Sequence, residues 1–234
     1  MLAFALLTLA ACGERLPTYR YKITVEVETP EGLRTGSAVR EVRSYDLGKG
    51  FPGPEAGGGR SKLIGEAVAV DLPNGDALFA LLRGEDESQG HPEVIASQAL
   101  RPFVEARLGR SLETASVGKQ DVEGRLEVLR TSSLKATVKP NNYPLLVRFR
   151  DMDDPSSVEK VEPDNLSESF GQGYALRRIT VETTDERVTT GIRSRLEWMD
   201  EQKAAFIKRP KGMSMWDLPI GGRLTTRDFE RGGR

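Results

Sequence analysis

The chain has 234 residues, of which 38% are hydrophobic and 29% are charged, and its 34 Lys and Arg residues nearly balance 35 Asp and Glu residues. This composition is typical of a globular protein long enough for one hydrophobic core or two small ones. Because a net charge of −1 creates no overall field that attracts phosphate backbones, we do not expect a nucleic-acid partner.

The N-terminal segment differs from the rest of the chain because residues 2–11 contain only one polar side chain, Thr8. A helix that spans a bilayer needs about 20 apolar residues, so this segment is too short to be one. Its length suits the hydrophobic region of an export signal, which usually has about 7–15 residues and ends in small side chains. The segment therefore predicts a signal peptide over residues 1–11.

The end of this segment, Leu9-Ala10-Ala11-Cys12, resembles the lipobox of bacterial lipoproteins. The resemblance implies cleavage between Ala11 and Cys12 and covalent attachment of a diacylglycerol and a further acyl chain, such as palmitate, to Cys12. One acyl chain binds a membrane only marginally, so two or three would provide a stable anchor. No other cofactor is expected, and the membrane would be the first partner of the protein.

The resemblance also implies a location in the bacterial cell envelope, with the body facing the periplasm. Residues 12–18 would form a tether whose extended length is at most about 25 Å. Glu14 stands where an Asp retains similar lipoproteins in the inner membrane, so the sequence favours the outer membrane.

An alternative interpretation of the N-terminus remains open, because no Lys or Arg lies between Met1 and Cys12. Residues 2–11 would then be a buried helix or strand of a cytosolic globular protein, and Cys12 would be a core thiol. Since Cys12 is the only cysteine and cannot form an internal disulfide, we favour the lipoprotein interpretation.

Alternating apolar and polar residues predict antiparallel strands in the first half of the chain. The first hairpin has strands over 19–29 and 37–45, and Val39 and Val42 are the expected buried residues of its second strand. The second hairpin has strands over 63–72 and 77–82, joined at Asn74-Gly75, which is a strong hairpin signal. The denser apolar content of the second hairpin predicts burial on both faces. We expect the two hairpins to form one four-stranded sheet.

The second half of the chain alternates helix and strand patterns. Residues 91–109 predict a helix with a kink at Pro102, and its inward face is expected to carry Ile95, Ala99, Phe103 and Ala106. The other expected elements are a helix over 122–130, strands over 143–150 and 175–184, a short helix over 163–171, and an amphipathic helix that begins at Thr189 and turns Ile192, Leu196 and Met199 inward. The predicted fold class is α+β.

The globular body is expected to cover residues 19–204, with a sub-boundary near 84–92, and residues 205–234 to form an irregular arm. Met213, Met215 and Trp216 are the expected anchors of this arm to the core. The last 34 residues carry eight basic and four acidic side chains. Because Asp217, Asp228 and Glu230 interrupt the basic run, we interpret it as a solvated tail.

Few residues in the sequence are candidates for catalysis or metal binding. His91, the only histidine, lies between Gly90 and Pro92, and a surface position is the expected one. Asp151, Asp153 and Asp154 follow a predicted buried strand and are a candidate calcium site, since calcium takes six to eight oxygen ligands. Pro155 replaces the glycine of an EF-hand loop, and Asp side chains near a proline more often cap their own turn. No catalytic residue is predicted.

The stretch from 143 to about 200 contains F-x-D-x-x-D-P, then S-V-x-x-V-x-P-D-x-L, then F-G-x-G. These motifs resemble a recurring pattern in uncharacterised bacterial proteins, which implies no activity. We therefore expect a non-catalytic, lipid-anchored envelope protein that binds another envelope protein or helps an assembly. One alternative is a hydrolase or carbohydrate-binding module that uses paired acids such as Asp151 and Asp154 beside an aromatic cleft. The other alternative is the cytosolic globular protein described above.

Overall fold

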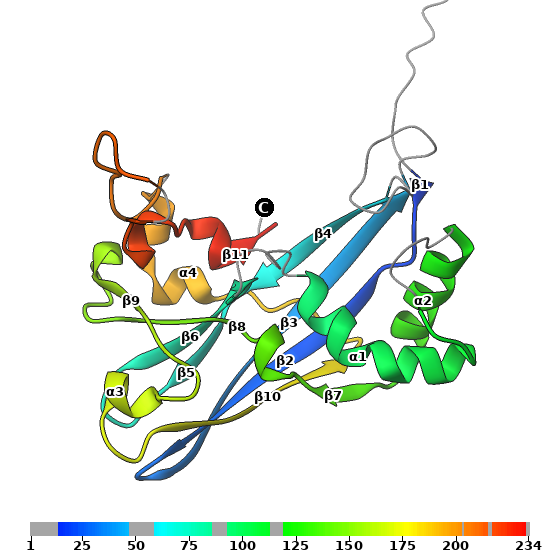
Figure 1. Ribbon diagram of the computed structural model, residues 1–234, viewed down its shortest axis with the longest axis horizontal. Helices are drawn as coiled ribbons and strands as arrows, with labels where there is room; N and C mark the ends of the chain where they lie inside the picture. The colour runs from blue at the N-terminus through cyan, green and yellow to red at the C-terminus, as the bar shows by residue number, and fades with distance from the viewer. Residues whose placement is uncertain are drawn as a thin grey trace, which may run out of the picture.

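The computed structural model describes residues 14–46, 59–85, 93–112, 119–202, 204–214 and 217–232. Within these ranges antiparallel strands form two sheets, and the two longer helices follow the first six strands (Figure 1). The fold class is therefore α+β, as the sequence predicts. Residues 1–13, which include the predicted signal peptide and Cys12, lie outside the described residues.

The larger sheet has seven strands in the spatial order β11-β4-β3-β2-β10-β7, with β1 beside one end of β3. Its central hairpin joins Tyr19 to Val42 and Thr29 to Gly32, as the alternating sequence predicts. The bounds of its strands are β1 Glu14–Arg15, β2 Tyr19–Thr29, β3 Gly32–Asp46, β4 Gly59–Glu66, β7 Lys135–Thr137, β10 Ala175–Thr183 and β11 Glu230–Arg231.

The smaller sheet has four strands in the order β5-β6-β8-β9. Its bounds are β5 Val68–Asp71, β6 Ala77–Gly84, β8 Pro144–Phe149 and β9 Val158–Lys160. The hairpin predicted at Asn74-Gly75 is confirmed, since Val70 pairs with Leu78. Gly75 has φ of 89°, a left-handed conformation that glycine adopts without steric cost.

The expectation of one four-stranded sheet from the two hairpins is wrong. The chain leaves the larger sheet at the end of β4, Glu66, and enters the smaller sheet at Val68, with only Ala67 between them. The Ala67 N–H, between the two strands, donates to the carbonyl of Phe229, 2.7 Å away. A residue near the C-terminus therefore accepts the hydrogen bond of a backbone N–H that belongs to neither sheet. The sequence 63–72 therefore contributes one strand to each sheet.

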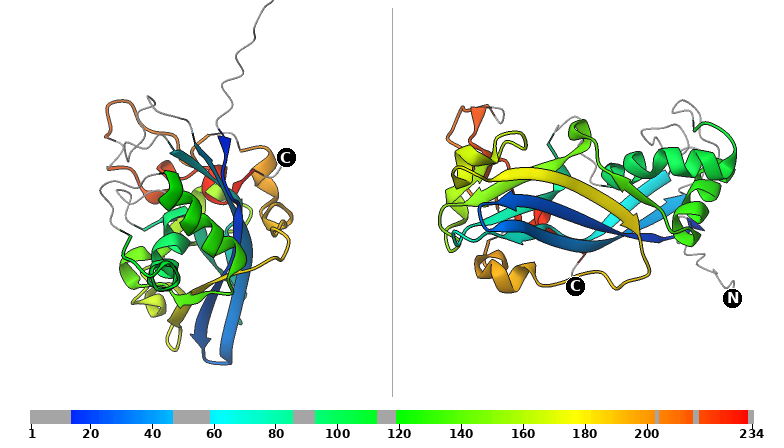
Figure 2. Two further views of the ribbon diagram at one scale, coloured as in Figure 1. Left: turned by 90° about the vertical axis from the view of Figure 1, so that its right-hand side faces the viewer. Right: turned by 90° about the horizontal axis from the view of Figure 1, so that it is seen from below.

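The helices α1 (Glu93–Leu108) and α2 (Lys119–Thr131) cover one face of the larger sheet near one end of the molecule (Figure 2). The inward face predicted for α1 is partly wrong. Ile95 is buried, but Phe103 is 44% exposed and Ala106 is exposed, whereas Ala96, Leu100 and Val104 form the buried stripe. Spacings of four residues place these three on one helical face, which only packing on the sheet selects.

Two cores share the smaller sheet. The first lies between the larger sheet, the helices and one face of β5 and β6, and includes Tyr21, Leu78 and Leu100. The second lies on the opposite face and is closed by the C-terminal part of the chain, with Phe79 and Phe229 at its centre. Burial of β6 on both faces is therefore confirmed, because alternate residues of this strand enter different cores.

The strand β3 corrects a second expectation about inward faces. Val42 enters the first core with Ala38, but Val39 lies on the outer face of the sheet. Residues three apart cannot share a face in a structure with a period of two. Val39 is nevertheless buried because the segment before α4 crosses the outer face, where the Thr189 N–H donates to the Val39 carbonyl at 3.2 Å.

The amphipathic helix predicted from Thr189 is short and interrupted. α4 spans Ile192–Arg195, and a 3₁₀ turn over Glu197–Asp200 follows. Leu196 separates them because its φ and ψ of −123° and 75° lie outside the helical region. The predicted inward residues Ile192, Leu196 and Met199 are all buried, since each packs into the second core.

Residues expected to form an irregular arm contribute to the body. Phe206, Leu224 and Phe229 are buried in the second core, and β11 pairs with β4. Met213 is 39% exposed and is not an anchor. Met215 and Trp216, the other predicted anchors, lie outside the described residues.

The short helix α3 (Leu166–Phe170) lies within the predicted range 163–171 and completes the described helices. Leu166 and Phe170 are buried, and the Gly171 N–H caps the helix by donating to the Ser167 carbonyl at 2.9 Å. Gly171 has φ of 102°, which explains why a glycine ends this helix.

Candidate functional site

The predicted lipid-attachment site lies next to the first described strand. Cys12 and Ala11 are outside the described residues, but Glu14 and Arg15 already pair with Asp46 and Tyr45 of β3. Leu16 is buried, and its N–H donates to the Ser44 carbonyl at 3.0 Å. Strand pairing therefore holds the chain from Glu14 onward, within the range 12–18 that the sequence predicts as a tether.

The three aspartates predicted as a weak calcium site form a hydrogen-bonded turn between β8 and β9. The Asp151 carboxylate accepts from the Asp153 N–H at 3.0 Å. The Asp154 carboxylate accepts from the Ser156 N–H at 2.8 Å and from the Ser156 hydroxyl at 2.7 Å. These bonds lower the pKa of Asp154. The carboxylates of Asp151 and Asp154 thus cap backbone groups of their own turn, which is the structural alternative to calcium binding.

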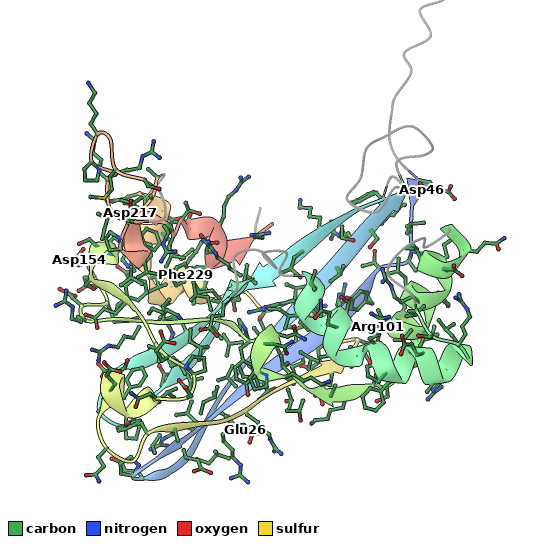
Figure 3. The ribbon with its side chains drawn as sticks, in the orientation of Figure 1. Glu26, Asp46, Arg101, Asp154, Asp217 and Phe229 are labelled. Carbon is green, nitrogen blue, oxygen red and sulfur yellow. The ribbon has the colours of Figure 1, made fainter. Side chains whose placement is uncertain are left out.

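Trp198 lies beside this turn, although it is far away in the sequence. Its indole N–H donates to the Met152 carbonyl at 2.9 Å. Its ring packs at 5.5 Å from Phe149 and 5.0 Å from Phe206 between ring centroids. Figure 3 shows Asp154 at one end of the molecule, outside the second core that contains Phe229. The half-buried tryptophan therefore links the turn to the edge of the second core.

The neighbouring acids are engaged with cations. Glu159 binds Arg148 at 2.8 Å and Arg150 at 3.0 Å, and Glu162 binds Lys160 at 2.9 Å. Within the described ranges no group of three His, Cys, Asp or Glu side chains has a geometry that could hold a metal ion. His91 and Trp216 lie outside the described residues.

Asp154→Ala is expected to lower the melting temperature, because the Ser156 N–H loses its acceptor at the start of a 3₁₀ turn. Adding millimolar calcium is expected to leave the melting temperature of both proteins unchanged. Thermal unfolding with and without calcium measures both effects. A rise in melting temperature with calcium in the wild type, lost in Asp154→Ala, would contradict the capping role.

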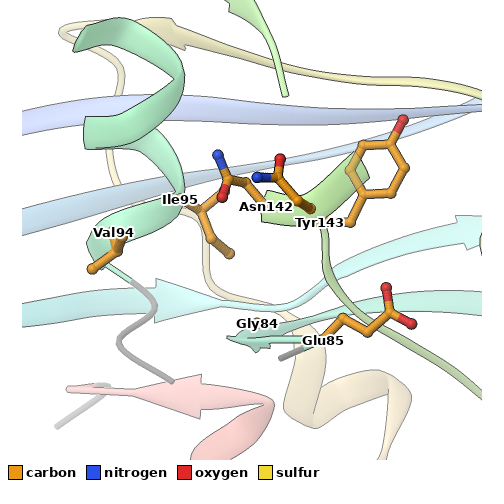
Figure 4. Close-up of a pocket in the computed structure, with 7 residues that line it drawn as sticks. Gly84, Glu85, Val94, Ile95, Asn142 and Tyr143 are labelled. Carbon is orange, nitrogen blue, oxygen red and sulfur yellow. The ribbon is translucent and has the colours of Figure 1, made fainter. Parts of the chain in front are cut away.

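A small pocket lies between the end of β6, the start of α1 and the segment before β8 (Figure 4). Its volume is about 10 Å³, which is close to the space that one water molecule needs. Glu85 and Tyr143 line it, but Glu85 is paired with Lys160 at 3.0 Å, and burial raises the pKa of Tyr143. As the described residues line it, the pocket has room for about one water molecule and not for an organic substrate.

The outer face of the larger sheet carries a charge cluster centred on Glu41. The side chain of Glu41 is 6% exposed and receives hydrogen bonds from Arg20 at 2.8 Å and Arg43 at 2.6 Å. Burial alone would raise the pKa of Glu41, but these two cations outweigh burial and hold it below its ordinary value. Glu41 therefore stabilises the fold in its ionised form.

The contribution of Glu41 is expected to depend on pH. Because its pKa is lower in the folded state, its stabilisation is complete above the ordinary Glu pKa of about 4.3 and is lost as the pH falls through the folded-state pKa. Glu41→Gln is expected to cost about 1–2 kcal/mol at pH 7 and less as the pH falls below about 4.3. Urea unfolding from pH 3 to pH 7 measures this difference. A difference that does not change with pH would contradict the ionic role.

Among the described residues the most deeply buried charged side chain is Arg40, whose burial is not among the predictions from the sequence. Its side chain is fully buried between the two sheets, and its guanidinium donates to the carbonyls of Glu66 at 3.0 Å and Ala80 at 3.2 Å. Burial lowers its pKa, whereas Tyr21 and Glu66 favour its charged form. Arg40 lies midway between Ala38 and Val42, and all three residues point to the same, inward face of β3. This alternation is the sequence feature from which the burial of Arg40 could have been predicted.

Among the described residues no helix combines the length and the apolar character needed to cross a membrane. The chain matches no protein-family model, no curated protein and no solved structure.

Proposed function

We propose that this chain is a lipid-anchored protein of the bacterial cell envelope that binds or helps assemble other proteins and has no catalytic activity. The observation that carries the proposal is the order of ten apolar residues, Leu9-Ala10-Ala11 and a single cysteine. The body supports it because β1 begins two residues after Cys12. Acyl chains on Cys12 would therefore hold a folded body close to the membrane surface.

The hydrogen bonds and ion pairs of the acidic side chains near the β8–β9 turn support a non-catalytic function. Asp151 and Asp154 accept hydrogen bonds from their own turn, and Glu159 is bound by two arginines. General acid catalysis would need a carboxyl group whose pKa is raised, whereas the pKa of Asp154 is lowered.

The hydrolase or carbohydrate-binding alternative draws on one observation, the position of Trp198 beside the turn that holds Asp151 and Asp154. Its indole N–H already donates to Met152, and its ring packs against Phe149 and Phe206. A sugar-binding tryptophan presents its ring to the ligand, so this contact set favours the non-catalytic proposal.

Metabolic labelling with palmitate tests the proposal. The wild type is expected to carry label and to fractionate with membranes, whereas Cys12→Ala is expected to lose all label because it has no thiol. The matched control Cys12→Ala/Gly13→Cys keeps one thiol but moves it out of the Leu9-Ala10-Ala11 pattern, and it is also expected to remain unlabelled. Equal label in the wild type and Cys12→Ala would refute the lipid anchor.

A further inference from the structure

We propose that the basic loop formed by residues 207–214 contacts an anionic lipid surface. This inference deepens the proposed function, because it assigns the face of the body that meets the membrane. Three described cations, Lys208, Arg209 and Lys211, are exposed in this loop, and Met213 is 39% exposed beside them. Cations next to an exposed apolar side chain are the combination that anionic lipid headgroups and the adjoining acyl region bind.

The loop has a defined shape and is not a loose tail. At its base the Ile207 N–H donates to the Gly221 carbonyl at 3.0 Å. At its tip the Met213 N–H donates to the Pro210 carbonyl at 3.3 Å, and Gly212 between them has φ of 86°. The fold therefore displays the three cations on a turn that is fixed to the second core.

Three acidic residues, Asp217, Asp228 and Glu230, interrupt the basic sequence. Two of them do not neutralise its positive charge at the surface. Asp228 is 8% exposed, and its carboxylate accepts from the N–H and the hydroxyl of Thr225. The Glu230 side chain is 10% exposed and is bound by Arg193. Asp217 remains exposed near the loop. In the described part of the chain, Lys208, Arg209 and Lys211 make no ion pair, so their charge faces solvent.

The position of the loop relative to β1, the first described strand, favours a lipid surface over other acidic partners. In Figure 1 and in the left view of Figure 2, the basic loop and β1 both lie on the upper side of the molecule, whereas the β2–β3 turn lies on the lower side. Figure 3 shows the same arrangement, with Asp217 and Asp46 on the upper side and Glu26 on the lower side. An anchor on Cys12 would bring the basic loop to the membrane at a second, distant point.

Single-cysteine probes test this contact in the full chain. The background Cys12→Ala has no thiol and no acyl chains, and an environment-sensitive fluorophore is attached to Met213→Cys or, as the matched control on the lower side, to Leu33→Cys, where the native side chain is 46% exposed. Vesicles of phosphatidylcholine with and without phosphatidylglycerol are the probes of the lipid surface. The 213 probe is expected to shift to the blue only with phosphatidylglycerol, and the 33 probe is expected not to shift.

Charge variants give an independent measurement. Lys208→Gln/Lys211→Gln is expected to bind phosphatidylglycerol vesicles about twenty-five-fold more weakly, since each cation near an anionic surface contributes about fivefold. Arg34→Gln/Arg177→Gln, which removes the same charge near the β2–β3 turn, is expected to change binding less than twofold. Residues 2–11 are present in every protein compared, so their affinity for vesicles cancels.

The outcomes separate this inference from the proposed function. An unshifted 213 probe on vesicle-bound protein, equal shifts at 213 and 33, or equal losses in the two charge variants would overturn the contact. A 213 shift with a soluble acidic peptide but not with vesicles would replace the lipid surface by a protein partner. Failure of the lipid anchor would appear only in palmitate labelling, because the vesicle experiment uses protein without Cys12.

Discussion

Gly36→Ala is expected to destabilise the protein by about 3 kcal/mol or more, because the two sheets meet at this residue with no room for a side chain. A Cβ atom at position 36 would lie 2.1 Å from the Ala69 carbonyl oxygen and 2.8 Å from the Ala69 carbonyl carbon. Both are backbone atoms of β5, so the contact cannot be relieved by a side-chain rotation. The sheets would have to separate, and overpacking of this kind costs about 1–3 kcal/mol or occasionally more.

Chemical denaturation of Gly36→Ala against the wild type measures this cost, and Gly124→Ala is its matched control. Gly124 lies in α2, and a Cβ atom there would meet only the Leu108 side chain at 3.8 Å, an ordinary contact. The same substitution is therefore expected to stabilise by about 0.5–1 kcal/mol, as Gly to Ala does inside a helix. Equal effects at positions 36 and 124 would mean that the sheets are not in contact at Gly36.

Arg40→Ala is expected to destabilise the protein by about 3–5 kcal/mol, because it empties a buried site and leaves polar groups without partners. The carbonyls of Glu66 and Ala80 would each lose the bond that Arg40 donates. The Glu66 carboxylate would keep the Ile192 N–H at 2.8 Å but lose a nearby positive charge. Thus one residue of β3 holds the end of β4 and the middle of β6 together.

A double variant separates the charge of Arg40 from its volume. Arg40→Met restores most of the volume but removes the positive charge near the Glu66 carboxylate, whereas Arg40→Met/Glu66→Gln removes both charged groups. The double variant is expected to be more stable than Arg40→Met alone, since an unpaired buried charge costs more than a replaced pair. Urea unfolding of the wild type and the single and double variants forms a double-mutant cycle. Simple additivity would show that Arg40 acts through packing and its carbonyl bonds only.

Patterns between near neighbours were sufficient to predict most individual elements. The hairpin of β2 and β3 and the hairpin at Asn74-Gly75 are present, as are α2, β8 and β10. Alternation with a period of two and the chemistry of short turns depend on residues a few positions apart, so the sequence contains this information directly. The predicted class, α+β, follows from these elements alone.

Part of the candidate site could also be predicted from patterns between near neighbours in the sequence. Asp151, Asp153 and Asp154 form the turn expected from aspartates near a proline. The contact of this turn with Trp198 joins residues 46 positions apart, and no local pattern predicts it. The lipobox interpretation of Cys12 rests on sequence alone, because residues 1–13 lie outside the described residues.

The sequence by itself determined the local elements, the fold class and the lipobox pattern around Cys12. Only the tertiary structure decided that residues 63–72 divide between two sheets, that α1 turns Leu100 and not Phe103 inward, and that Arg40 is buried. The same is true of the basic C-terminal region, where the fold withdraws Asp228 and Glu230 from the surface. The physical reason is that burial depends on contacts between distant segments, such as Arg40 with Ala80, whereas propensity and periodicity act over a few residues.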